Sequence, residues 1–152
     1  MSKGFTFEKN LPHQQKGVDA VTTVFLGAEP KQSSDATMRI LANPELELVD
    51  AKYYSNIKMI HEHNRIEHTS EHYDSTSSII DVSMETGTGK TYTYTKTMFE
   101  LNKSFGINKF IVVVPTLSIK AGTVNFLKSD ALKEHFRDDY EREIKTYVVE
   151  SQ

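Results

Sequence analysis

The sequence predicts an α/β domain built on a parallel sheet. Two short apolar runs, residues 79–84 and 108–114, have the character of strands, and each is followed by apolar residues at helical spacing. A glycine-rich turn, residues 86–91, joins the first run to its helix. Strands that alternate with helices favour a parallel sheet with right-handed crossovers.

The N-terminal part predicts one helix. Pro12 suits the first turn of a helix, where its missing N–H does no harm. Val18, Val21 and Phe25 then recur on one face, and Gly27 provides a stop. We expect residues 1–27 to form the first segment of the chain.

Residues 28–78 show weaker periodicity and are interpreted as an insertion or a loop-rich lead-in. Serine and Asn-Pro breaks interrupt any long element, although Ile40 and Leu41 allow a short helix and residues 46–49 a short strand. Four histidines fall in or near one stretch: His61, His63, His68 and His72. Their carboxylate neighbours favour an exposed charged stretch over a metal site.

Residues 79–152 form the third predicted segment. After the glycine-rich turn, Tyr94, Met98, Leu101 and Phe105 follow helical spacing up to a C-cap glycine, Gly106. A second helix is expected from residue 117, another over 131–140, and a third strand over 144–149.

Composition excludes several classes of protein. The 152 residues include no cysteine, which excludes disulfides and thiolate metal sites and favours a cytoplasmic setting. The longest apolar run, 110–114, is far too short for a membrane span. The net charge is −3, yet residues 86–128 hold six lysines and a single carboxylate, Glu100. That basic half is either a solvated helix face or a nucleic-acid surface.

The glycine-rich turn has the chemistry of a phosphate-binding loop. Glycines let successive backbone N–H groups approach crowded phosphate oxygens, and the following helix adds its N-terminal dipole. A lysine here reaches the β and γ phosphates, and the next hydroxyl can coordinate Mg²⁺. The residues concerned are Thr86, Gly87, Thr88, Gly89, Lys90 and Thr91.

Residues 84–91 resemble motif I of the superfamily 2 helicases, in the shortened form used by restriction-enzyme translocases. Met84 stands where the longer consensus requires glycine. Residues 11–20 are similar to the segment L-R-P-Y-Q of the same superfamily, and Gln14 matches the glutamine that recognises adenine, while His13 replaces the tyrosine. A carboxamide suits adenine because it can donate and accept together. The alternative is a surface glutamine on an amphipathic helix.

Residues 113–120 resemble motif Ia, which contacts the nucleic-acid backbone in these helicases. Thr116 and Lys120 are the matching candidates for phosphate contact. An ordinary helix start capped by Thr116 or Ser118 is an equal alternative.

Taken together, the chain resembles the N-terminal part of the Res subunit of type III restriction enzymes. The resemblance implies a partial RecA-like domain, an ATP and Mg²⁺ site, double-stranded DNA as substrate, a modification (Mod) subunit as partner and a nuclease domain elsewhere. No apolar strand ending in Asp-Glu is present, so no catalytic residue is assigned. The other hypothesis is a non-catalytic nucleotide-binding module. An incomplete sheet would expose strand edges and favour association.

Overall fold

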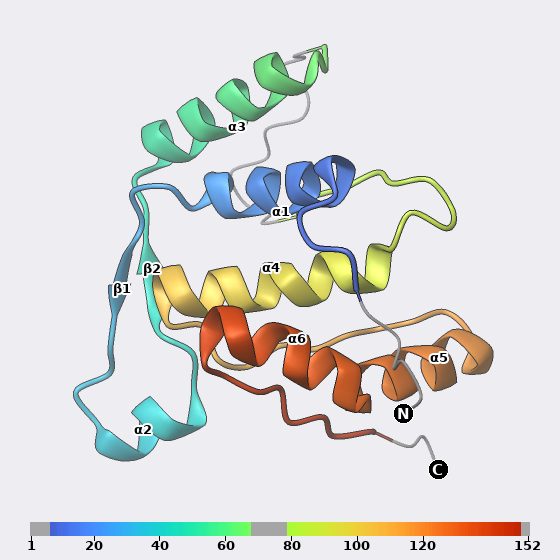
Figure 1. The fold of residues 1–152 in the computed structure, drawn as a ribbon. Coiled ribbons are helices and arrows are strands. Elements are labelled where there is room, and N and C mark those ends of the chain that lie inside the picture. The colour runs from blue at the N-terminus through green and yellow to red at the C-terminus, as the bar shows by residue number, and fades with distance from the viewer. Residues whose placement is uncertain (1–6, 68–78, 150–152) are drawn as a thin grey trace. The chain divides into compact units, whose positions relative to one another are not determined.

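The computed structural model describes residues 7–67 and 79–149, which fall into two compact units. The larger unit lies within Pro12–Phe110, and the smaller unit comprises residues 7–11 and 111–149. The larger unit contains α1 (Pro12–Val24), β1 (Glu29–Lys31), α2 (Ala36–Leu41), β2 (Glu45–Glu47), α3 (Asp50–Asn64) and α4 (Lys90–Phe105) (Figure 1). The smaller unit contains α5 (Leu117–Lys128) and α6 (Asp130–Tyr140). The units differ from the segments 1–27, 28–78 and 79–152, which stay a sequence prediction.

Helices α1 and α4 pack side by side and form the centre of the larger unit (Figure 1). Val18 is fully buried, and a Cβ on Gly17 would lie 3.1 Å from the Thr93 methyl carbon, so glycine allows the close approach. Lys96, buried on α4, donates a hydrogen bond of 2.6 Å to the Gln15 side chain. The predicted helix starting at Pro12 is confirmed.

Helix α4 ends where the sequence predicted. Gly106 adopts a left-handed conformation, with φ of 72°, and its N–H donates to the Asn102 carbonyl. A residue without Cβ adopts this conformation at little cost, which explains the stop.

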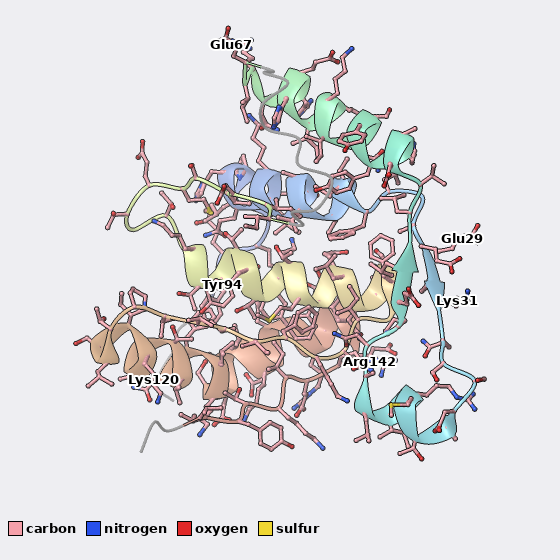
Figure 2. The ribbon with its side chains drawn as sticks, turned by 180° about the vertical axis from the view of Figure 1, so that it is seen from behind. Glu29, Lys31, Glu67, Tyr94, Lys120 and Arg142 are labelled. Atoms are coloured by element: carbon pink, nitrogen blue, oxygen red, sulfur yellow. The ribbon has the colours of Figure 1, made fainter. Side chains whose placement is uncertain are left out.

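A two-stranded antiparallel hairpin follows α1. Residue 29 pairs with residue 47 and residue 31 with residue 45, and the short helix α2 lies between the strands. Lys31 extends from β1 (Figure 2) and binds Glu47 at 2.7 Å, and this hydrogen bond and charge raise the pKa of Lys31. The predicted short helix at Ile40 and Leu41 is confirmed as α2, whereas the short strand expected over residues 46–49 spans Glu45–Glu47.

Helix α3 lies within residues 28–78, where the sequence analysis expected no long element, so that part of the expectation was wrong. The one buried side chain of α3 is polar: Asn56 is 1% exposed and donates to the Val24 and Leu26 carbonyls. These carbonyls lie at the end of α1, where helix hydrogen bonding leaves acceptors unpaired. Since α3 is anchored there by an amide, apolar periodicity gives little sign of it.

The predicted parallel sheet is not found among the described residues. Their only sheet is the β1–β2 hairpin, and residues 79–84, 108–114 and 144–149 contain no strand. Ile79, Ile111 and Val113 are 75%, 93% and 87% exposed, whereas buried strands were expected. A β-strand forms only when it is hydrogen-bonded to a neighbouring strand. An apolar run in the sequence does not show which segment, if any, would be that neighbour.

The smaller unit is held by its helices. Leu132 and Phe136 of α6 are almost fully buried, and Phe7 packs edge-to-face on Phe126 with ring centres 5.5 Å apart. Ser129 caps α6 by accepting from the Leu132 N–H. The predicted helices from residue 117 and over 131–140 are confirmed. Within the described part of the chain, no helix is long and apolar enough to cross a membrane.

Candidate functional site

The glycine-rich turn forms a tight loop at the start of α4. Gly87 and Gly89 both have left-handed backbones, with φ of 80° and 85°, and Gly89 is the N-cap of the 16-residue helix. Side chains disfavour this conformation, so both positions favour glycine for a physical reason. The loop therefore places a flexible backbone directly before a helix N-terminus, which suits an anion.

Two donors converge on one carbonyl inside the loop. The Lys90 ammonium donates to the Glu85 carbonyl oxygen at 2.5 Å, and the Thr88 hydroxyl donates to the same oxygen at 2.7 Å. Both contacts are exposed to solvent, and the Lys90 contact is to a neutral acceptor. A phosphate oxygen can replace that acceptor, because a charged acceptor forms the stronger hydrogen bond.

The first turn of α1 also contacts the loop. His13 Nε2 and Gln14 Nε2 each lie 3.0 Å from the Thr88 carbonyl oxygen. Gln14 packs so closely that a Cβ on Gly89 would lie 2.3 Å from its Nε2. The sequence pairs these residues only through the family resemblance, since they are separated by more than seventy positions.

One buried acceptor on Gln14 has no partner among the described residues. Gln14 is 7% exposed, and its Oε1 makes no hydrogen bond. The orientation of the carboxamide follows from the Thr88 carbonyl, which requires the amide nitrogen to face it. A buried acceptor without a donor is unfavourable, so Oε1 fits a ligand that brings an N–H group.

The other predicted loop residues lie in the same place. Thr86 is exposed in the turn, and Thr91 is half-buried as the second residue of α4. The structure thus gathers Gln14, Thr88, Gly89 and Lys90 at one end of α4.

The predicted nucleic-acid residues, Thr116 and Lys120, lie in the smaller unit. The Thr116 side-chain oxygen accepts from the Ile119 N–H and caps α5, as the alternative interpretation expected. Lys120, on α5 (Figure 2), donates to the Val149 carbonyl at 2.9 Å. Neither contact tests a role in binding nucleic acid.

An open cavity of about 750 Å³ adjoins the loop. It is lined by α1, α3 and residues 79–85, and both His13 and Thr88 belong to its wall. Ile57 and Ile60 of α3 supply apolar lining. Sequence reasoning missed this wall because it missed α3.

In the ranges that the structure describes, no three acidic or histidine side chains lie close enough together to hold a metal ion. Asp81 lines the cavity, and Asp139 pairs with Lys9 at 2.8 Å. His68 and His72, considered for metal binding from their spacing, lie outside the described residues.

Comparison with known proteins decides the family. The family model described as "Type III restriction enzyme, res subunit" matches residues 55–151. The chain belongs to this Res-subunit family. Its match covers α4, α5, α6 and the glycine-rich loop, so the loop geometry described above lies largely within the shared region.

Res subunits from several sources are similar to this chain. It is 74% identical over 152 residues to the EcoPI Res subunit of Escherichia phage P1 and 69% identical to the EcoP15I Res subunit of Escherichia coli. Each match covers all of this chain and 16% of the relative. The StyLTI Res subunit of Salmonella typhimurium strain LT2 is 37% identical over 133 residues, covering 88% of this chain and 11% of that protein.

Proposed function

We propose that this chain is the ATP-binding N-terminal portion of a type III Res subunit. The observation that carries the proposal is the buried, unpaired Oε1 of Gln14 beside a left-handed glycine loop. The exocyclic amine of adenine is the donor that this acceptor lacks, and the second N–H of the Gln14 amide suits the ring nitrogen next to it. Family membership supports the same ligand.

The loop residues fit the phosphates and a divalent cation. Backbone N–H groups at Gly87 and Gly89 would face the phosphate oxygens, and Lys90 would exchange the Glu85 carbonyl for the β and γ phosphates. The Thr91 hydroxyl would be a ligand of Mg²⁺, which neutralises phosphate charge. In this role Thr86 and Thr88 shape the loop.

For the whole protein we infer ATP-dependent movement on double-stranded DNA and DNA cleavage together with a Mod subunit, in the cytoplasm. The support is the family and the Res subunits named above. Thr116 and Lys120 are the proposed contacts with the DNA backbone. A hydroxyl and an ammonium at the start of α5 suit phosphate oxygens.

A second candidate is a module that binds nucleotide without hydrolysing it. The sequence supports this candidate for the chain taken alone, because its 152 residues contain no apolar run that ends in Asp-Glu. Hydrolysis requires a carboxylate that holds magnesium and orients water. Binding and turnover are therefore separate questions.

Both candidates are tested by one pair of measurements. Binding of a fluorescent ATP analogue with Mg²⁺ is followed for the unaltered chain, for Lys90→Ala and for Lys103→Ala, together with phosphate release. Lys103 lies exposed on the same helix and controls for loss of one positive charge. We expect binding to be lost only in Lys90→Ala. Release that depends on Lys90 would reject the non-hydrolysing module, and absence of binding in the unaltered chain would reject the proposed function.

A further inference from the structure

His13 contacts the phosphate loop through a hydrogen bond whose direction is certain. Its Nε2 lies 3.0 Å from the Thr88 carbonyl oxygen, which can only accept. Nε2 must therefore carry a hydrogen, and both the neutral ring protonated at Nε2 and the imidazolium meet this requirement. His13 is a donor to the loop in either form.

The Thr88 carbonyl controls the direction of a neighbouring N–H group. This carbonyl and the Gly89 N–H belong to one trans peptide, so they point in opposite directions. Holding the oxygen toward α1 turns the Gly89 N–H away from α1. Because Thr88 lies between two left-handed glycines, this peptide is less restrained by its own backbone than one in a helix.

Gln14 also donates a hydrogen bond to the Thr88 carbonyl, but in the proposed function its carboxamide binds adenine as well. In that function the Gln14 carboxamide would divide its hydrogen bonds between the base and the loop, whereas the hydrogen bond of the His13 ring goes to the loop. We propose that His13 is a positioning residue that holds the Thr88 carbonyl, and with it the Gly89 N–H, while Gln14 serves the base. This inference rests on the proposed function and assigns His13 to the phosphates.

The competing role is stacking of the His13 ring on the base. Two substitutions separate these roles. His13→Gln keeps an N–H donor at a similar reach and removes the ring, and His13→Phe keeps an aromatic ring and removes the donor. His13 is exposed, so neither change disturbs the core.

The first readout is the dissociation constant of fluorescent ATP and GTP analogues with Mg²⁺. We expect His13→Gln to bind like the unaltered chain and His13→Phe to bind both nucleotides about five-fold more weakly, equivalent to roughly 1 kcal/mol for one hydrogen bond. The loss should be independent of the base because the loop contacts phosphates. Weak binding by His13→Gln with normal binding by His13→Phe would overturn the proposal in favour of stacking.

The second readout needs no nucleotide. Hydrogen–deuterium exchange over residues 85–91 of the unliganded chain should be faster in His13→Phe than in the unaltered chain and unchanged in His13→Gln. Equal exchange in all three proteins would overturn loop positioning even if nucleotide binds. If the unaltered chain binds no nucleotide, the proposed function fails, and the exchange measurement still decides whether His13 holds the loop.

Discussion

Substitution of Gly89 by alanine tests the packing of α1 against the glycine-rich loop. Gly89 has φ of 85°, and a Cβ there would lie 2.3 Å from Gln14 Nε2 and 3.4 Å from Gln14 Cδ. The end of the glutamine side chain can swing aside more easily than the backbone. The clash is then relieved by moving the carboxamide, which loses its hydrogen bond to the Thr88 carbonyl.

The expected loss has two parts. A left-handed backbone costs a residue with a side chain about 1–2 kcal/mol relative to glycine. Loss of the Gln14 hydrogen bond adds about 1 kcal/mol. We therefore expect Gly89→Ala to lower the free energy of unfolding by about 2–3 kcal/mol.

Gly87 provides the matched control. Its φ is 80°, and a Cβ there would have no neighbour within 4 Å, so Gly87→Ala carries only the backbone cost of about 1–2 kcal/mol. Urea unfolding measures both variants, and Gly89→Ala is repeated in a Gln14→Ala background, where the clash is absent. The extra loss at Gly89 should then disappear. Equal losses at the two glycines in the unaltered background would refute the reasoning.

Three further predictions concern the rest of the chain. Thr116→Ala should lower the free energy of unfolding by about 1 kcal/mol because α5 loses its N-cap, and Thr116→Ser should retain it; equal losses in urea unfolding would contradict the cap. Asn56→Ala should lower the free energy of unfolding by about 2–3 kcal/mol because two carbonyls at the end of α1 lose their donor. Asn64→Ala should lower it less, because the Asn64 amide binds within its own helix. Urea unfolding compares the two variants, and a larger loss in Asn64→Ala would reject the anchoring role of Asn56. The exposed apolar side chains of Ile111 and Val113 should make the chain associate as its concentration rises. A variant with both Ile111→Lys and Val113→Lys should stay monomeric in analytical ultracentrifugation. Association that persists in this variant would show that other residues make the contact.

Local rules were sufficient for much of the helical structure. The N-terminal proline of α1 and the left-handed Gly106 after α4 were expected from residue type, and a Thr116 cap of α5 was one of two alternatives; the structure has each of them. These features depend on the backbone preferences of one residue or on a bond to its near neighbours. The same reasoning gave the loop before α4, since Gly87 and Gly89 adopt the conformation that only glycine tolerates well.

Pairing between distant segments was beyond the sequence. The apolar run at 108–114 was expected in a parallel sheet, yet the described residues give it no strand neighbour, and α3 was missed because its buried anchor is the amide of Asn56. A hydrophobic pattern indicates which face of a helix or strand is apolar, but it does not indicate which other segment packs against that face.

The candidate site likewise has features that were predicted from the sequence and features that only the tertiary structure showed. The sequence alone predicted the glycine-rich turn as a phosphate-binding loop, and the resemblance suggested Gln14 beside it. Only the tertiary structure brought His13 and Gln14 onto the Thr88 carbonyl across 75 and 74 positions. It also left Oε1 of Gln14 buried without a donor among residues 7–67 and 79–149. The physical reason is that a backbone conformation is set by a residue and its neighbours, whereas a hydrogen bond between distant residues is set by how their helices pack.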